Sequence, residues 1–262
     1  MNNERKTYLK KVRTKKITVI CVRIAILIGV IGFWELATLT SLADAFFFSS
    51  PSRIVKLFIS MAGGELWKHV LITLKECLLA FAISSLIGFT LAIILWWSDY
   101  LRQILDPYIV VLNSLPKIAL GPLIIIWAGT GQTAIITMAV LISVIVTVIS
   151  VLNGFLNTDK DKIFLLRSMG ASKIQILIKL VLPSAIPDFI ASMKVGVGLA
   201  WVGTIMGEYL VSGAGLGYLI IYGGAVFNLD LVMMSTVILC LLAAIMYFSV
   251  AFIEKKFTKF TK

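Results

Sequence analysis

The apolar residues of this chain gather in runs that are each about as long as a lipid bilayer is thick. The runs occupy residues 17–39, 70–97, 107–129, 133–152, 186–210 and 231–253. A helix needs about 20 residues to cross the roughly 30 Å hydrocarbon layer of a membrane. Each run reaches that length, so the pattern predicts an all-α integral membrane domain over residues 17–253 with six transmembrane helices.

The third run, residues 107–129, is irregular. Proline and glycine interrupt it close to Asn113 and Lys117. A helix that is broken at membrane depth must face protein or a water-filled cavity, because lipid cannot satisfy free backbone groups. Asn113 and Lys117 are therefore candidates for a polar pathway through the membrane. The alternative is a kinked helix that serves only packing.

The fifth run, residues 186–210, carries three polar or aromatic positions seven residues apart. A charge near the bilayer centre is costly, so a face that carries charges is expected to meet a cavity or a partner. The alternative is that the charged groups lie near opposite helix ends and reach the two membrane interfaces. The pathway candidates in this run are Lys194, Trp201 and Glu208.

Glycine recurs in the fifth run and in residues 211–230 that follow it. Small residues allow helices to approach closely inside a membrane. The candidates for such packing are Gly196, Gly198 and Gly203. The later glycines form a GxGxG pattern that follows no strand, so a dinucleotide-binding turn is rejected and a partly re-entrant outer segment is predicted.

Basic residues are concentrated in three segments that flank the apolar runs. Of the 24 Lys and Arg residues, seven lie in residues 1–16, five in the loop 154–187 and four in the tail 254–262. Basic loops stay on the cytoplasmic side and face anionic lipid. This distribution places both termini and the loop 154–187 in the cytoplasm, and residues 40–69 and 211–230 outside. Membrane lipid, rather than nucleic acid, is the expected partner of the net charge of +11.

Composition agrees with a membrane protein that performs no chemistry of its own. The chain is 60% hydrophobic and 14% charged, whereas soluble domains average about 45–50% and about 25%. It lacks the GxxxxGK[ST] loop that cradles nucleotide phosphates. Its single histidine and three isolated cysteines have no metal-ligand spacing. We therefore expect no catalytic residue, no metal site and no cofactor bound by this chain.

Three further expectations concern the segment between the first two runs and the start of the second. His69, the only histidine, has no evident partner and is expected in solvent or at the membrane interface. Lys75 and Glu76 are expected to extend their charged ends toward the lipid headgroups. Ser52 is expected to cap a short surface helix that ends at Gly63 and has an apolar face formed by Ile54, Leu57, Phe58 and Met61.

The loop 154–187 is too regular to be a linker. Thr158 with Asp161, and Ser172 with Gln175, have the spacing of capping boxes that begin helices. Gly170 lies between them, where a helix can end in the left-handed conformation. The loop therefore predicts a short helix, a tight corner at Gly170 and a second short helix, all at the membrane surface.

The second short helix is expected to end at Pro183 and Pro187, because proline cannot continue a helix interior.

In the loop 154–187 the chain resembles the integral-membrane permease subunits of bacterial ABC importers. Their cytoplasmic signature reads Glu-Ala-Ala, three residues, Gly, nine residues, then Ile-x-Leu-Pro. The coupling positions that the resemblance assigns are Arg167, Ser168, Met169, Gly170, Ala171, Ser172, Leu180, Leu182 and Pro183.

The resemblance is not uniform along the signature. The sequence of residues 167–172, RSMGAS, looks like the RSLGAS version of the sulfonate, taurine and nitrate importer branch. Phe164, Leu165 and Leu166 stand where Glu-Ala-Ala is usual, which leaves open how an ATPase would contact this helix. Similarity continues outside the loop, in SSPSR, LDP, GLAW and AGLGYLI.

The resemblance implies a type I, MetI-like permease core in a bacterial inner membrane. Six spans would form half of a pore, so the implied partners are a second permease copy, with the three glycines near the dimer axis, two ATP-binding subunits that hold ATP and Mg²⁺, and an extracytoplasmic solute-binding protein. The implied cargo is a small solute such as a sulfonate, nitrate or taurine-like anion. The alternative is a secondary transporter, or another polytopic membrane protein, without a partner ATPase.

Overall fold

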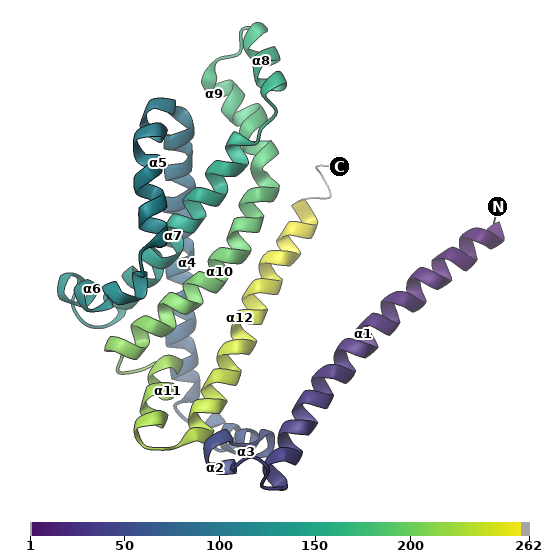
Figure 1. Cartoon of the computed structure of the whole chain (residues 1–262), viewed down its shortest axis with the longest axis vertical. Coiled ribbons are helices and arrows are strands. Elements are labelled where there is room, and N and C mark those ends of the chain that lie inside the picture. Colours follow the sequence, from purple (N-terminus) through teal and green to yellow (C-terminus); the bar gives the residue numbers. More distant parts are fainter. Residues whose placement is uncertain (1, 258–262) are drawn as a thin grey trace.

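The computed structural model describes the backbone of residues 2–257 and the side chains of residues 8–255. Every regular element in that part of the chain is helical, and most of the helices run along one long axis (Figure 1). Within the described residues, five helices are long and apolar enough to cross a membrane, and counting one bent pair as a single span gives six. The long helices are α1 (Asn2–Leu39), α4 (Leu66–Trp97), α7 (Gln132–Leu156), α10 (Leu182–Val211) and α12 (Leu229–Phe257).

Helix α7 lies at the centre of the bundle, where it packs against both α4 and α10. Glycines bring these helices together: a Cβ atom at Gly203 of α10 would lie 2.4 Å from the Cα atom of Ala139 on α7. A Cβ atom at Gly88 of α4 would lie 2.7 Å from Thr147 on α7. Lipid is as apolar as a side chain, so close van der Waals packing of this kind is what holds membrane helices together.

The third span is broken, as its sequence predicts. Helix α5 (Asp99–Ser114) is followed by a 3₁₀ turn, η1 (Lys117–Leu120), and by α6 (Gly121–Ala128), with a bend of 86° between the two parts. The span begins at Asp99 rather than at Pro107, because Ser98 caps it and accepts a hydrogen bond from the N–H of Leu101. Pro107 is accommodated inside the helix.

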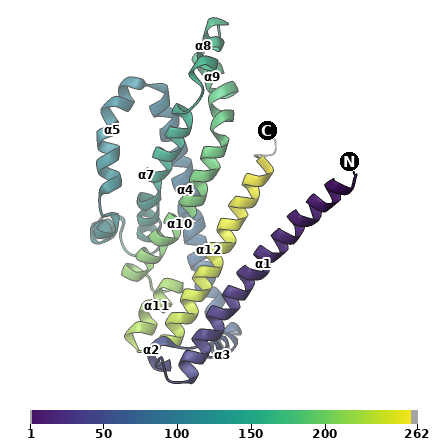
Figure 2. The same cartoon turned by 45° about the vertical axis from the view of Figure 1, so that its right-hand side comes forward.

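Helix α1 stands apart from the bundle (Figures 1 and 2). Residues 2–16 of the predicted basic segment continue into the first span as one helix, and the apolar window of that span is not buried by the other described residues. The helix is held at its end by the loop that follows: the indole N–H of Trp34 donates to the carbonyl of Phe48 at 3.2 Å, and Glu35 accepts from the N–H of Ser52 at 3.0 Å.

Two short helices, α2 (Ala45–Phe48) and α3 (Pro51–Ala62), lie at the end of the bundle where α1 stops. The predicted apolar face of α3 is confirmed, because it packs on the main core, and Gly63 ends the helix. The predicted cap is wrong by two residues: Ser50 caps α3, with Pro51 at its first position, and Ser52 donates its backbone N–H to α1 instead.

The glycine-rich segment 211–230 forms a short helix, α11 (Leu216–Ala225), which packs on α12, α10 and α4. Asp230, near the start of α12, connects α12 to the α2–α3 region. It forms an ion pair of 2.8 Å with Arg53 and accepts a hydrogen bond from the hydroxyl of Ser49 at 2.7 Å. Residues 258–262 of the predicted basic tail lie outside the described residues.

Candidate functional site

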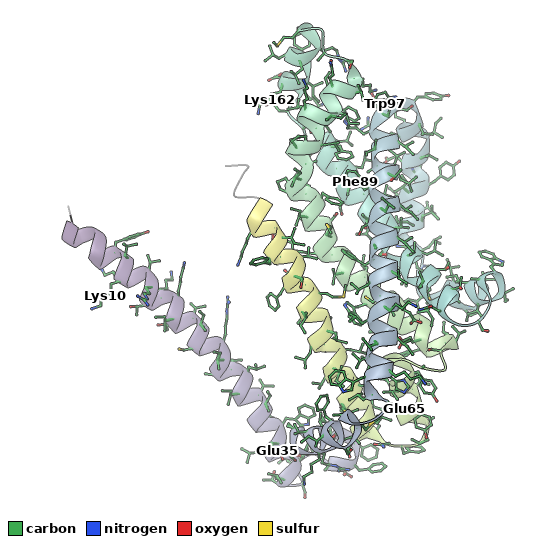
Figure 3. The ribbon with its side chains drawn as sticks, turned by 180° about the vertical axis from the view of Figure 1, so that it is seen from behind. Lys10, Glu35, Glu65, Phe89, Trp97 and Lys162 are labelled. Atoms are coloured by element: carbon green, nitrogen blue, oxygen red, sulfur yellow. The ribbon has the colours of Figure 1, made fainter. Side chains whose placement is uncertain are left out.

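The loop 154–187 lies at the far end of the bundle from α2, α3 and α11 (Figure 1). Figure 3 shows Trp97 and Lys162 at this end, and Glu35 and Glu65 at the opposite one. The loop contains α8 (Lys160–Ser168), a corner, and α9 (Lys173–Ile176). We call the part from α8 to α9 the coupling segment.

The corner is made by Gly170, which has a φ of +83°. The N–H of Ala171 donates to the carbonyl of Leu166, and the N–H of Gly170 to that of Arg167, both at 3.0 Å. These two hydrogen bonds form a Schellman motif, which satisfies carbonyls that the end of a helix leaves free. The predicted left-handed corner at Gly170 is therefore confirmed.

The second predicted capping box is confirmed, and the first is wrong. Ser172 and Gln175 satisfy each other's backbone N–H groups at 2.8 and 3.4 Å. Asp159, rather than Thr158, caps α8, and its carboxylate accepts from two N–H groups of the first turn. A carboxylate also interacts favourably with the positive end of the helix. The hydroxyl of Thr158 instead lies 3.0 Å from that of Ser184.

The predicted helix end at Pro183 and Pro187 is also wrong. Helix α9 runs through a π-helical turn, η2 (Leu177–Val181), directly into α10, and residues 173–211 form a single helical unit. In a π-turn each carbonyl accepts a hydrogen bond from the N–H five residues further on. A carbonyl four residues before a proline, which has no N–H to offer, can therefore pair with the residue after the proline. The coupling segment is thus continuous with a membrane span, and Leu180, Leu182 and Pro183 lie along the junction of η2 and α10.

One face of α8 in the coupling segment is partly buried, and the other face is exposed. Ile163 and Leu166 pack on the core cluster beneath them. Phe164, Leu165 and Met169 point away from it, with 72%, 59% and 74% of their surface exposed. These three side chains, which we call the exposed apolar tip, form a surface of the kind that enters a groove on another protein.

A basic cavity of about 460 Å³ separates the coupling segment from the turn between α4 and α5. Lys173 bridges the two sides, because its ammonium group donates to the carbonyl of Trp97 at 2.6 Å and lies 5.4 Å from the centre of the Trp97 ring. The cationic residues of the lining are Arg102, Lys160, Arg167 and Lys173. This contact fixes the position of α9 relative to the end of α4.

The five predicted pathway residues do not meet at one place. Asn113 and Lys117 lie at the bend of the third span, where the Lys117 ammonium donates to the backbone carbonyl of Asn113 at 3.2 Å. On α10, Lys194 forms an ion pair of 2.9 Å with Glu254 of α12. Trp201 packs in the core, and Glu208 is buried against α11.

The three predicted packing glycines have different surroundings. Gly203 contacts α7 as described above, and a Cβ atom at Gly196 would lie 3.5 Å from the Phe81 ring of α4. Nothing within 4 Å faces Gly198, which leaves that position open to another chain. Packing at an axis between two copies stays a prediction for Gly198.

The expectations for His69 and Glu76 are wrong, because both side chains are buried. Together with Thr73 they line the face of α4 that meets α10 and α11. A signal for this cluster is present in the sequence: positions 69, 73 and 76 have the four- and three-residue spacing of one helix face. Their partners on other helices are visible only in the structure.

Residues 84–259 match the family described as "Binding-protein-dependent transport system inner membrane component". A probable ABC transporter permease protein of Haemophilus influenzae is 29% identical over 88% of this chain and 95% of the relative. The taurine transport system permease protein TauC of Escherichia coli is 26% identical, over 94% and 90%. The putative aliphatic sulfonates transport permease protein SsuC of the same organism is 28% identical, over 87% of each.

The fold is also that of a solved transporter. A chain of the MetNI methionine ABC transporter, in an inward-facing crystal form, superposes with a TM-score of 0.67 and 21% identity, over 73% of this chain and 95% of that chain. This confirms the predicted MetI-like fold class. The chain therefore belongs to the inner-membrane component family of binding-protein-dependent transport systems, and is an ABC importer permease, a membrane transport subunit rather than an enzyme.

Proposed function

We propose that this permease forms half of the pathway by which an ATP-driven importer carries a small anion, of the sulfonate, taurine or nitrate type. Two relatives that align over most of the chain are named for taurine and aliphatic sulfonates, which supports the substrate class. The other half of the pathway is a second permease copy, and two separate ATP-binding subunits supply the energy. An extracytoplasmic solute-binding protein delivers the cargo.

The observation that carries this proposal is the continuity of the coupling segment with α10. The Schellman corner and the Ser172 capping box fix α8 to α9, and α9 passes into α10 without a break. A displacement of α8 by an ATPase is therefore transmitted along a helix rather than lost in a loop. Rigid-body movement of this kind would switch the pathway between inward and outward openings.

The arrangement of the ends supports a topology with both termini in the cytoplasm. The first turns of α1 and the last turns of α12 point toward the end of the bundle that holds the coupling segment (Figures 1 and 2). The sequence places basic residues at all three of these segments, in accord with the positive-inside rule. The ATPase subunits would then approach the exposed apolar tip from the cytoplasm.

The docking role predicts a specific effect of charge at the exposed apolar tip. Replacing both Phe164 and Met169 with glutamate should weaken binding of the ATPase subunit on the order of 30-fold, because loss of a packed apolar anchor costs about 2 kcal/mol. Both side chains are exposed in this chain, so its own fold is expected to be kept. The measurement is recovery of the ATPase subunit with the tagged permease from detergent extracts.

A matched control is Leu42→Glu, since Leu42 is 81% exposed and lies just beyond α1, at the other end of the bundle. This variant should recover as much ATPase subunit as the unchanged chain. If the Phe164/Met169 variant also did so, the exposed apolar tip would not be the docking surface. Uptake of a taurine probe by energised vesicles that lack the ATPase would instead favour the secondary transporter.

A further inference from the structure

The first turn of α11 is buried against α4 and α10. The first N–H groups of a helix have no partner within the helix, so other groups must satisfy them. Here side chains from the two long helices accept these hydrogen bonds. The pairs are Gly215 with His69 Nδ1 at 2.9 Å, Leu216 with Thr73 Oγ1 at 2.7 Å and Gly217 with Glu208 Oε2 at 2.5 Å.

A second carboxyl group, that of Glu76, lies close enough to the carboxyl group of Glu208 for the two to interact. Both residues are almost fully buried, with 2% and 1% of their surface exposed. Oε2 of Glu76 and Oε1 of Glu208 have no hydrogen-bond partner in the described part of the chain. Two adjacent buried carboxylates repel each other strongly, so a pair of this kind does not stay doubly ionised.

In the described part of the chain no cation forms an ion pair with either glutamate. His69 accepts a hydrogen bond at Nδ1, so its imidazole is neutral. Lys75, the neighbour of Glu76 on α4, acts on Glu76 through its charge, but no ion pair among the described residues joins it to either glutamate. The other titratable groups near the pair are Cys77 of α4, Tyr209 of α10 and Tyr218 of α11. The acids of α12, Asp230 and Glu254, are paired with Arg53 and Lys194.

The geometry also leaves little room for a bound metal ion at this point. A Cβ atom at Gly215 would lie 2.5 Å from the carboxyl group of Glu208, and one at Gly217 would lie 2.8 Å from it. The backbone of α11 therefore closes directly over the carboxyl group. A proton needs no such space, and it converts one acid into the donor that the unpartnered oxygens lack.

The two carboxyl groups are not equivalent. Glu208 receives a backbone N–H at the N-terminal end of α11, where a negative charge is favoured. Glu76 receives no backbone N–H in the described structure, so the proton is better placed on Glu76. We propose that Glu76 and Glu208 bind one proton between them, with Glu76 as the acid that donates to the Glu208 carboxylate. This bound proton closes the junction of α4, α10 and α11.

Removal of the proton places a second charge in a buried site, which opposes the docking of α11. With the proton in place, the native state binds one proton more at neutral pH than the unfolded chain does. The free energy of unfolding therefore falls as the pH rises and the native pair loses that proton. The junction lies at the end of the bundle opposite the coupling segment, where α11 packs on α12 and α4. We therefore expect the packing of α11 on α4 and α10 to weaken as the pH rises.

Infrared spectroscopy of the full-length permease in lipid nanodiscs tests this directly. The unchanged protein should show the carbonyl band of a protonated carboxyl group at neutral pH. The band should shift with isotope-labelled glutamate and disappear as pH is raised. Glu76→Gln should remove it, and the matched control Glu65→Gln, at an exposed acid just before the same helix, should leave it unchanged. Absence of the band in the unchanged protein overturns the proposal, and so does its survival in Glu76→Gln.

Thermal unfolding gives an independent readout. The melting temperature of the unchanged permease should fall as the pH rises and the band disappears. Glu76→Gln keeps the shape and a donor for Glu208, so its melting temperature should not change over that range. Equal pH dependence in the two proteins overturns the proposal. If Glu76→Gln does not fold, the infrared titration of the unchanged protein still tests the proposal, because a carboxyl band must be present at neutral pH and disappear as the pH is raised.

Discussion

Replacing Gly170 with valine should reduce ATP-driven uptake at least about tenfold and leave the helical bundle folded. Nothing lies within 4 Å of a Cβ atom at this position, so steric contact is not the cause. The cause is the φ of +83°, which costs an L-residue about 1–2 kcal/mol and more when the side chain is branched at Cβ. The corner between α8 and α9 would open, which separates the exposed apolar tip from α10.

The measurement is uptake of a taurine or alkanesulfonate probe by proteoliposomes that contain the whole transporter, together with ATP hydrolysis. The matched control is Gly63→Val at the end of α3. That glycine also has no neighbour within 4 Å, but its φ is −83°, which valine adopts without strain. Uptake at the unchanged level in Gly170→Val would show that the corner does not transmit the ATPase movement.

Replacing Gly203 with leucine should abolish recovery of folded permease. A Cβ atom there would lie 2.4 Å from Cα of Ala139, so even the first added carbon cannot fit without moving α7 away from α10. Overpacking usually costs about 1–3 kcal/mol, and here backbone rather than a flexible side chain opposes it. Because α7 is the central helix of the bundle, we expect the separation to spread to its contact with α4.

Folded protein is measured as the monodisperse fraction after detergent extraction and by its melting temperature. Gly198→Leu is the matched control on the same helix, since no atom of the other described helices lies within 4 Å of a Cβ atom there. It should yield normal amounts of folded chain. A reduced fraction of dimer in that variant would place Gly198 at the interface between two copies. Normal recovery of Gly203→Leu would contradict the packing described here.

The membrane architecture and the corner at Gly170 could be predicted from the sequence because both follow from local rules. Span length depends only on bilayer thickness, and a left-handed corner depends on the one residue that lacks a side chain. The Ser172 capping box is equally local, since both partners lie within one helical turn. Predictions of this kind need no knowledge of what surrounds the segment.

The predictions for His69 and Glu76 were wrong because they depended on distant neighbours. His69 was expected at a surface, but it is buried because the backbone of Gly215, far along the chain, donates to it. Glu76 was expected at the headgroups, but it faces Glu208. Pro183 was expected to end a helix, but a π-turn lets the helix continue. For the two buried side chains the tertiary arrangement supplied a partner that local rules do not contain, whereas for Pro183 the π-turn supplied a backbone geometry that the sequence pattern did not predict.

The amino-acid sequence alone determined that this chain crosses the membrane and that a helix–Gly–helix corner stands between two spans. It determined these because apolar length and backbone freedom are properties of short segments. Only the tertiary structure decided that the corner is continuous with α10 and that three pathway candidates on α10 face other helices of the same chain. Only it brought Glu76 to Glu208, because a contact between residues 132 positions apart depends on how whole helices pack.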